Sequence, residues 1–232
     1  MEFIEHDVEL IAVSTPVSRT NKGYEASEKG VIKNWIEKII EKAARICYAS
    51  KPSETDEHRN TFINKLINVN HHESIAEHAC VTFKITTRRD VLAEITRHRL
   101  ASYSVESQRY VNYDKKGLKF IPPQKINRDR LKYLVENDPF EPSYDLDAYA
   151  WFNHIKAVEI NYKYLLEQGW KPEEARDILP NCTATQIIMT ANIREWKHIL
   201  SLRCADSAYI EMRIIANKIN NILKQISPTC FP

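Results

Sequence analysis

Apolar residues recur along this chain at the spacings of amphipathic helices. Over residues 31–49 they lie on one helical stripe, made of Ile36, Ile39, Ile40, Ala43, Ile46 and Cys47. Residues 58–69 fit a second, shorter helix. Residues 208–222 show the clearest helical period, with apolar residues stepping by four, three, four and three. The pattern therefore predicts helices over these three segments.

Other segments carry the patterns of strands and loops. Residues 81–86 (VTFKIT) alternate between apolar and polar side chains, which is the period of a half-buried strand. Residues 8–13 and 118–121 are short runs that favour strands, and two prolines stop the second. Turn formers, charges and serines predict loops over residues 14–30 and 100–117.

Capping residues mark the helices of the second half of the chain. Residues 147–168 fit a long helix that Gly169 ends, and Pro172 opens a short helix after it. Asn192 and Glu195 form an Asn-x-x-Glu capping pattern ahead of a further helix.

Few strands and several helices predict an α+β fold, in which a small mixed or antiparallel sheet packs with the helices. A length of 232 residues suits one domain, so we expect residues 1–232 to form a single domain. Residues 124–146 are polar and contain two prolines, and we expect an irregular excursion from the core there.

Composition narrows the class of protein. With 33 basic and 31 acidic residues, the net charge is only +2, which argues against a protein that coats nucleic acid. The five cysteines form no C-x-x-C pair, as expected in a reducing cytoplasm. The first residues do not resemble a signal peptide, and no apolar run is long enough to span a bilayer. We therefore expect a cytoplasmic protein that does not bind membranes.

The densest group of reactive side chains lies in residues 97–110, RHRLASYSVESQRY. It holds three arginines, one histidine and three serines. Guanidinium groups are planar and forked, and they bind phosphate and carboxylate groups well. The alternative is a solvated basic turn that pairs with Glu94 and Glu106.

Residues 71–78, HHESIAEH, combine histidines and glutamates, which are common metal ligands. The H-E-x-x-H pattern fails because Ala76 stands where the second histidine belongs. The inverse pattern fails at Ser74. We therefore predict no metal site here, and a polar helix start is the simpler interpretation.

A third set of polar residues lies toward the C-terminus: Arg176, Asn192, Arg194, His198 and Arg203. Arg203 stands in an apolar stretch, where a charge is costly unless it meets an acid or an anion, and Asp206 is its simplest partner. The chain has only 4 glycines, which excludes the usual glycine-rich phosphate loops. A nucleotide would have to be held by side chains and helix N-termini.

Four segments in order give the chain a family resemblance. Arg97-His98-Arg99, seven residues and then Ser107 resemble the signature of the flavin-dependent thymidylate synthases (the ThyX family). The segments HHESIAEH, EEARDILP and NIREWKHILSLRCADSA resemble three further stretches of that family. Together they cover most of residues 70–212.

The resemblance implies an enzyme that is both a methyltransferase and an oxidoreductase. It would convert dUMP to dTMP with 5,10-methylenetetrahydrofolate as the carbon donor, and FAD and NADPH would supply the reducing power. It also implies a homotetramer, with FAD bound across subunit interfaces and active sites built from several chains.

The resemblance assigns residues to each ligand. Those implied to hold FAD are Ser74, Arg97, His98, Arg99, Asn192, Arg194 and His198, with His72 near the flavin ring. Those implied to hold dUMP are Glu94, Arg97, Glu106, Ser107, Gln108, Arg109, Arg176 and Arg203. The chain departs from the family at Val105, which has no hydrogen-bonding side chain, and Glu106 is expected to take over that role.

Three residues are expected to act at the reacting atoms: Arg203, Ser107 and His72. Arg203 would stabilise negative charge on the pyrimidine so that its C5 becomes nucleophilic. A nucleophilic serine needs an adjacent base, and none stands out near Ser107, so we expect this serine to position dUMP.

Two other functions remain open from the residues alone. One is an RNA-binding module that uses the Arg-His-Arg turn together with Tyr103, Tyr110 and Tyr113. The other is a metal-dependent hydrolase built on residues 71–78.

Overall fold

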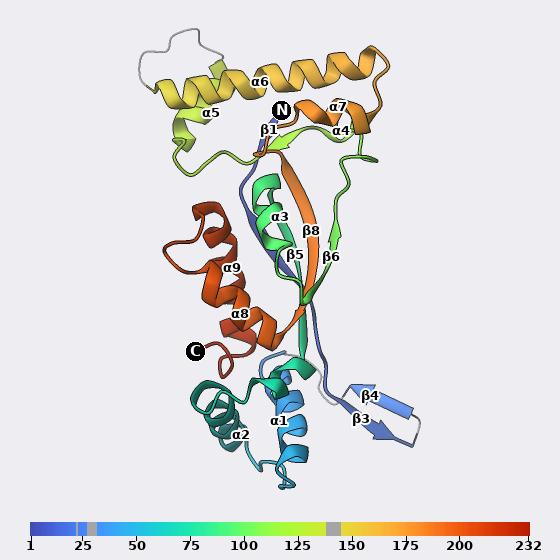
Figure 1. Cartoon of the computed structure of the whole chain (residues 1–232), viewed down its shortest axis with the longest axis vertical. Coiled ribbons are helices and arrows are strands. Elements are labelled where there is room, and N and C mark those ends of the chain that lie inside the picture. The colour runs from blue at the N-terminus through green and yellow to red at the C-terminus, as the bar shows by residue number, and fades with distance from the viewer. Residues whose placement is uncertain (22, 27–31, 138–144) are drawn as a thin grey trace. The chain divides into compact units, whose positions relative to one another are not determined.

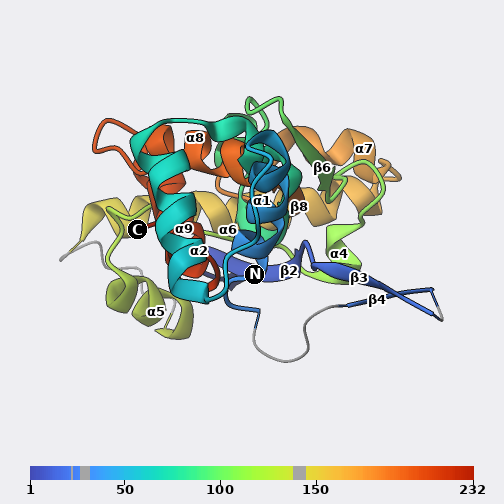
Figure 2. The ribbon, with the colours of Figure 1, turned by 90° about the horizontal axis from the view of Figure 1, so that it is seen from below.

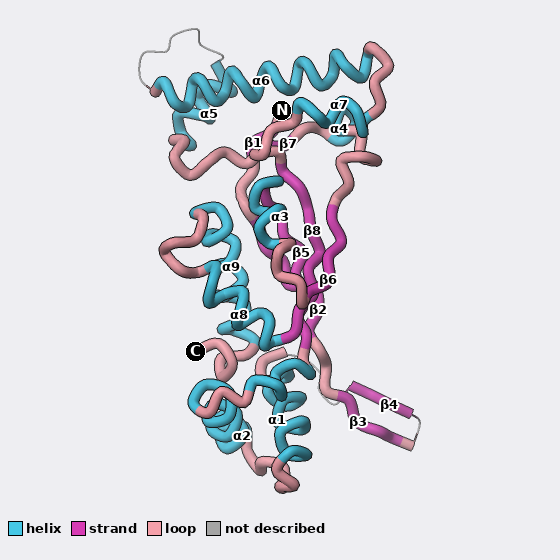
Figure 3. Tube along the Cα trace, viewed as in Figure 1, coloured by secondary structure: helices cyan, strands magenta, loops and turns pink. Residues whose placement is uncertain are grey.

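A computed structural model describes residues 1–21, 23–26, 32–137 and 145–232 of the chain (Figure 1). The described residues form two compact units. The first unit comprises residues 1–6, 86–95 and 105–187, and the second comprises residues 7–85, 96–104 and 188–232. Helices and strands occur in both units, so the α+β class is confirmed (Figure 3).

Four strands pair in the order β2-β5-β8-β6. They are β2 (Asp7–Val13), β5 (Cys80–Arg88), β8 (Ala184–Asn192) and β6 (Ala101–Val105). Strands β5 and β8 are antiparallel, because Ile193 N donates to Ala79 O at 2.9 Å and Arg89 N donates to Thr183 O at 3.2 Å. The alternation predicted for residues 81–86 is confirmed, since Val81, Phe83 and Ile85 are all buried.

Strands β6 and β8 were not predicted. Residues 101–105 were expected to be a loop, and no element was expected over residues 184–192. Strand β8 nevertheless carries a period of two, because Ile187, Met189 and Ala191 are buried between less buried neighbours. Its threonines and isoleucines also favour extended backbone.

The second unit contains two pairs of packed helices, and the two members of each pair contact each other. Helix α1 (Trp35–Cys47) contacts α2 (Asp56–Asn64), and the two lie side by side in both views of the ribbon (Figure 1 and Figure 2). Helix α8 (Ile193–Arg203) contacts α9 (Ile210–Ile226), which also packs on β2. The π-helix η1 (Lys65–Val69) and the 3-10 helix η2 (Glu73–His78) follow α2.

The apolar stripe expected on α1 is only partly correct. Ile36 and Ile40 are fully buried, but Ile46 is 83% exposed and Cys47 is exposed. The buried face instead contains Glu37 and Glu41 together with Ala44. Hydrogen bonds offset the free-energy cost of burying these carboxyl groups. Glu41 accepts them from two arginines, and Glu37 accepts one from Ser227.

A short hairpin occupies part of the loop expected over residues 14–30. Strand β3 (Val17–Thr20) pairs with β4 (Gly23–Ala26) in antiparallel register. Gly23 has φ of 123°, a backbone conformation that favours glycine. The hairpin is largely exposed, so it lacks the alternation that would have revealed it. Residues 22 and 27–31 of this segment lie outside the described residues.

The first unit is built mainly on one long helix. Helix α6 (Leu146–Glu167) contacts α5 (Arg128–Asn137), α7 (Pro172–Ala175) and the 3-10 helix η3 (Arg176–Ile178). The remaining elements are α3 (Arg89–Ile95), α4 (Tyr113–Lys116) and a short parallel pair of strands, β1 (Glu2–Phe3) with β7 (Lys119–Phe120). The helix expected over 147–168 is confirmed, and Gly169, with φ of 87°, follows its end.

The prediction of irregular structure over residues 124–146 is wrong for Arg128–Asn137, which form α5. Leu131 and Leu134 of this helix are buried in a cluster with Ala148 and Phe152. These apolar residues are separated by only one helical turn in a polar sequence, which explains why the pattern was too weak to predict. Residues 138–144 of the segment lie outside the described residues.

None of the helices in the described part of the chain is long and apolar enough to cross a membrane.

The C-terminal segment is attached to α1 through a buried carboxyl group. The Oε1 atom of Glu37 accepts a hydrogen bond from Ser227 Oγ at 2.7 Å. Its Oε2 atom is buried and has no hydrogen-bond partner among the described residues. Burial raises the pKa of Glu37, although the Ser227 hydrogen bond opposes the shift. Folding therefore makes this carboxyl group hold its proton more tightly than it does in the unfolded chain.

This raised pKa gives a pH-dependent stability. Because the folded state binds the proton more tightly than the unfolded state, the contribution of Glu37 is intact at low pH and is lost as pH rises through the folded pKa. Glu37→Gln cannot ionise, so its free energy of unfolding relative to the native chain should increase between pH 4 and pH 8. Urea unfolding at several pH values measures this difference.

The matched control is Glu57→Gln, which changes an exposed carboxylate in α2. Its free energy of unfolding, measured over the same pH range, gives the baseline for replacing a carboxylate by an amide at the surface. A constant difference for Glu37→Gln across the pH range would contradict a raised pKa of Glu37 in the folded protein.

Candidate functional site

A pocket of about 690 Å³ lies in the second unit, between η2 and the first turns of α8. Its lining consists of Glu73, Glu77, Leu100, Asn192, Arg194, Glu195, Lys197, His198 and Ser201. Three of these residues, Asn192, Arg194 and His198, were predicted to hold a cofactor. The volume falls in the range of small-molecule and cofactor sites, about 300–1,000 Å³.

Helix α8 starts at this pocket because its first turn is capped. The Oδ1 atom of Asn192 accepts a hydrogen bond from Glu195 N at 2.8 Å, which confirms the capping pattern. In the second turn, Trp196 is fully buried, and its Nε1 donates to Val81 O at 3.1 Å. The cap and this anchor fix the direction in which Arg194 and His198 leave the helix.

The cations of the pocket are balanced by carboxylates from η2. Arg194 forms an ion pair with Glu77, and its Nε lies 3.8 Å from Glu73. Lys197 Nζ lies 2.8 Å from Asn68 Oδ1 and 3.8 Å from Glu73. Burial lowers the pKa of Lys197, while Glu73 opposes that shift. The side chain of Arg194 is 52% exposed, so its pairs are open to exchange with an anion from solvent.

Lys197, Glu73 and Glu77 were not predicted as site residues. A signal for them was present in the sequence. Arg194 and Lys197 are three residues apart in the helix predicted after Asn192, so they lie on one side of it, and Glu73 and Glu77 lie close together in HHESIAEH. The two carboxylates attract the two cations across the pocket.

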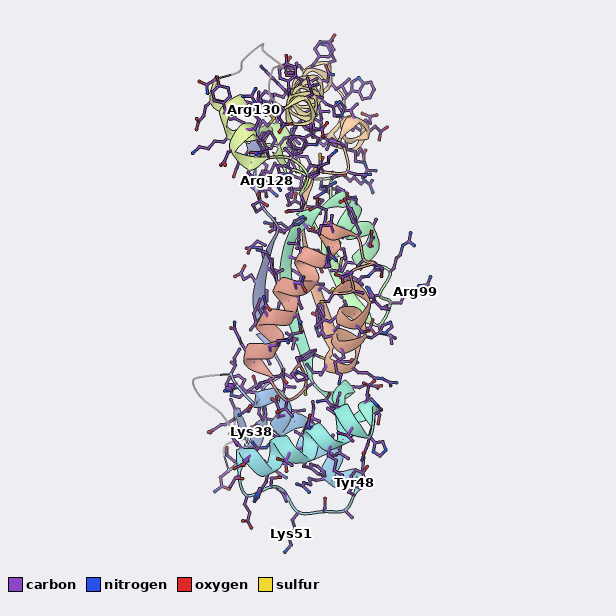
Figure 4. The ribbon with its side chains drawn as sticks, turned by 90° about the vertical axis from the view of Figure 1, so that its left-hand side faces the viewer. Lys38, Tyr48, Lys51, Arg99, Arg128 and Arg130 are labelled. Atoms are coloured by element: carbon purple, nitrogen blue, oxygen red, sulfur yellow. The ribbon has the colours of Figure 1, made fainter. Side chains whose placement is uncertain are left out.

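The start of η2 places His72 next to α1. Tyr48 follows the end of α1, and its hydroxyl lies 2.6 Å from His72 Nδ1, with the two rings stacked at 15°. Tyr48 is labelled in Figure 4, which shows the side chains as sticks. Ser74 is an exposed residue of η2 and is not among the residues that line the pocket.

The Arg-His-Arg turn presents its three side chains differently. Arg97 and Arg99 are exposed, and Arg99 points away from the ribbon in Figure 4. His98 is only 6% exposed. Its Nε2 accepts a hydrogen bond from Arg203 Nε at 3.0 Å, and its Nδ1 lies 3.9 Å from Glu195 Oε1. The second unit thus brings His98 and Arg203 into direct contact.

The partner expected for Arg203 was Asp206. The structure places Asp206 Oδ1 2.8 Å from Arg213 instead, while Arg203 donates to a histidine. The imidazole of His98 is therefore one of the partners of Arg203.

The first unit gathers a second set of predicted residues. Arg109 Nε donates to Glu173 Oε2 at 2.7 Å, and Arg176 Nε donates to the backbone oxygen of the same glutamate at 3.1 Å. Ser107 Oγ accepts a hydrogen bond from Arg109 N at 3.3 Å, and Gln108 is buried. Ser107, Arg109 and Arg176 are thus neighbours, although sixty or more residues separate the last from the others.

Two predicted carboxylates also lie in the first unit. Glu106 accepts a hydrogen bond from Tyr113 Oη at 2.9 Å and forms an ion pair with Lys116. Its oxygen atoms therefore already have partners within the chain. Glu94 is a partly buried residue of α3. Among the described residues, no group of three or more His, Cys, Asp or Glu side chains is arranged to hold a metal ion.

Comparison with known proteins decides the family. The family model described as thymidylate synthase complementing protein matches residues 31–229. The chain belongs to this family. The resemblance read from the four sequence segments is therefore confirmed.

Individual relatives agree with the thymidylate synthase complementing protein family. The chain is 34% identical to a flavin-dependent thymidylate synthase of Geobacter sulfurreducens over 204 residues, which cover 84% of this chain and 80% of the relative. It is 30% identical to a flavin-dependent thymidylate synthase of Corynebacterium efficiens over 238 residues, which cover 99% of this chain and 90% of the relative. The enzyme of the same name from Corynebacterium diphtheriae is 29% identical over 237 residues.

The cap of α8 has a measurable effect on stability. Asn192→Ala removes the acceptor for Glu195 N and should lower the free energy of unfolding by about 1 kcal/mol. Asn192→Ser keeps a capping oxygen and should lose only a fraction of that amount. Urea unfolding measures both, and the slope with denaturant should not change. Equal stabilities for the alanine and serine variants would show that Asn192 does not act as a cap.

Proposed function

We propose that this chain is a flavin-dependent thymidylate synthase. It converts dUMP to dTMP, takes the carbon from 5,10-methylenetetrahydrofolate, and uses FAD and NADPH as the source of reducing power. The observation that carries the proposal is the match of the thymidylate synthase complementing protein family to residues 31–229, together with relatives named for this activity. The RNA-binding and metal-dependent alternatives gain no support from these comparisons.

The pocket at the start of α8 fits a flavin dinucleotide. Such a cofactor carries two negatively charged phosphates, which favour cations and the N-terminus of a helix. Arg194 and Lys197 supply the cations, and the carboxylates of Glu73 and Glu77 hold their place until phosphate replaces them. Asn192 and His198 add polar contacts in the same lining. Bound there, the flavin supplies the hydride chemistry that no side chain can provide.

The other residues assigned to FAD remain predictions from the resemblance: Ser74, Arg97, His98 and Arg99, with His72 near the flavin ring. The exposed guanidinium groups of Arg97 and Arg99 are suited to phosphate. His72 is oriented by Tyr48, which supports a role that depends on the direction of its ring.

The residues of the first unit are proposed to hold the phosphate of dUMP. Arg109 donates to the carboxylate of Glu173, which an incoming phosphate can displace, and Arg176 donates to the backbone oxygen of the same residue. Ser107 and Gln108, beside them, are proposed to position the nucleotide by hydrogen bonds. Glu94 and Glu106 complete the proposed set. Because Glu106 is bound to Tyr113 and Lys116, we propose that it orders the loop before Ser107.

Arg203 is proposed to act on the pyrimidine. A guanidinium group near the uracil carbonyl oxygens stabilises the negative charge that develops when C5 becomes nucleophilic. The partly buried position of Arg203 strengthens its field, because screening by water is reduced there. On the strength of the family resemblance, we propose a homotetramer whose active sites combine residues from several copies. Each copy is proposed to be a single domain in the cytoplasm.

The proposed function has a direct test. Purified protein should show the absorbance bands of a flavin, and it should oxidise NADPH in a dUMP-dependent reaction that forms dTMP when methylenetetrahydrofolate is present. Omitting dUMP or the folate is the control. A protein that neither binds FAD nor forms dTMP under these conditions would refute the proposal.

Arg203→Ala should impair both dUMP binding and turnover. Removing one member of a set of charge-assisted contacts costs about 2–5 kcal/mol, so kcat/KM for dUMP should fall by at least about 30-fold. The flavin content should stay near that of the native enzyme. Arg213→Ala is the matched control, because it removes an arginine paired with Asp206 that has no proposed role at the site. Near-native kinetics for Arg203→Ala would contradict its assignment.

A further inference from the structure

Two exposed aromatic side chains beside η2 are held in one geometry. Tyr48 and His72 both lie at the surface, where side chains usually change rotamer freely. Here the two ring planes are only 15° apart, and Tyr48 Oη lies 2.6 Å from His72 Nδ1. Tyr48 is not among the residues assigned to FAD or to dUMP. Its contact therefore points to a function exerted through His72.

The backbone of Tyr48 is fixed where α1 ends. Ala49 N donates to Ile46 O at 3.2 Å, and Ser50 N donates to Arg45 O at 3.1 Å. These two hydrogen bonds form the Schellman motif, which reverses the chain after a helix. Ala49 has φ of 44°, a left-handed conformation that an alanine rarely adopts. The turn therefore fixes the direction in which the side chain of Tyr48 leaves the helix.

The backbone of His72 is fixed in a similar way, where η1 ends. His72 N donates to Leu66 O at 2.9 Å, and Leu66 is buried. The preceding residue, His71, has φ of 56°, so the chain turns through a left-handed residue here as well. Such backbone conformations persist where the surrounding structure enforces them, and they are common at functional sites. Both rings thus start from fixed backbone positions.

A buried carboxylate supports the ring of Tyr48 through two intermediate side chains. Glu41 is buried and accepts a hydrogen bond from Arg45 Nε at 3.1 Å. The guanidinium group of Arg45 lies 3.8 Å from the centroid of the Phe62 ring and also donates to Ser53 Oγ at 2.8 Å. Phe62 in turn meets Tyr48 edge to face at 6.4 Å. Cation–π and edge-to-face contacts have preferred geometries, so this series of contacts restricts rotation of the tyrosine ring.

We propose that Tyr48 is a positioning residue for His72. Its hydroxyl donates to Nδ1 and thereby selects one tautomer of the imidazole ring. A neutral imidazole has a single N–H, so an Nδ1 that accepts leaves the ring proton on Nε2. His72 then offers a ligand a hydrogen-bond donor whose direction is set by Tyr48. The proposal rests on the proposed role of His72 near the flavin ring.

Removal of the hydroxyl alone tests the positioning role. Tyr48→Phe keeps an aromatic ring against Phe62 and loses only the donor to His72. At saturating FAD, kcat per bound flavin should fall by about 10-fold, the scale set by one hydrogen bond. KM for dUMP should change little, because neither Tyr48 nor His72 belongs to the set proposed to hold dUMP. Tyr164→Phe, at an exposed position of α6, is the matched control and should behave as the native enzyme.

A double variant tests whether Tyr48 acts through His72. If it does, Tyr48→Phe adds no further loss of kcat in the His72→Ala background. Rates are expressed per bound flavin, because substitution of a residue proposed to lie near the cofactor can also change the affinity for flavin. A native kcat for Tyr48→Phe alone, or a full additional loss in the double variant, would overturn the proposal.

A measurement on the full chain without substrates separates this proposal from the proposed function. In protein labelled with ¹⁵N-histidine and held at alkaline pH, His72 should show a protonated Nε2 and an unprotonated Nδ1. Its signals are identified by their absence in His72→Ala, which changes an exposed residue and should fold. In Tyr48→Phe the two nitrogen signals should move toward each other, because both tautomers become populated. A protonated Nδ1 in the native chain, or signals that Tyr48→Phe leaves unchanged, would refute the pairing whether or not the protein forms dTMP.

Discussion

The candidate site depends on how the first turns of helix α8 are held. The helix begins directly after β8, so its start is fixed by the strand that precedes it. Asn192 caps the first turn, and Trp196 buries the second turn against β5, where its ring meets Phe83 edge to face at 5.2 Å. An indole that is both buried and hydrogen-bonded permits little rotation of the helix about its axis. The residues on the opposite side of α8 consequently keep constant directions.

That rigidity allows one helix to carry groups with different tasks. Its first turns present Arg194, Lys197 and His198 to the pocket, and its last residue, Arg203, meets His98. Glu195 and Arg203 are eight residues apart, about 12 Å along the helix axis, and His98 lies against both. A change in the start of α8 would therefore be transmitted to Arg203 as a change in helix direction.

Some features of the site and of the fold could be predicted from the sequence, and others could not. The Arg-His-Arg turn, the Asn192 cap and the arginines near Ser107 could be recognised because each is a local pattern of residue types. Strand β8 was missed, since its buried positions are occupied by residues as different as Met189 and Ala191. Helix α5 was missed because only two buried leucines mark it in a polar segment.

Contacts between distant segments were beyond the reach of local patterns. Arg203 was expected to pair with Asp206, a nearby carboxylate in the sequence, yet it donates to His98, which is 105 residues away. In the same way, the carboxylates that balance Arg194 come from η2. Both pairings require the folded backbone to bring the segments together. This is the physical reason that the sequence identified the charged residues without identifying what each one contacts.

The partners of the arginines distinguish two kinds of task. Arg194 and Arg109 pair with carboxylates on exposed side chains, which cost little to separate when a phosphate arrives. Arg203 donates through Nε to the buried ring of His98, and breaking this hydrogen bond would leave an unsatisfied acceptor in the interior. An arginine that binds phosphate benefits from an exchangeable partner, because its charge is needed only when the ligand is present. A hydrogen bond to a buried ring, in contrast, is kept whether or not a ligand is present, so it fixes the direction of Arg203 Nε in both states.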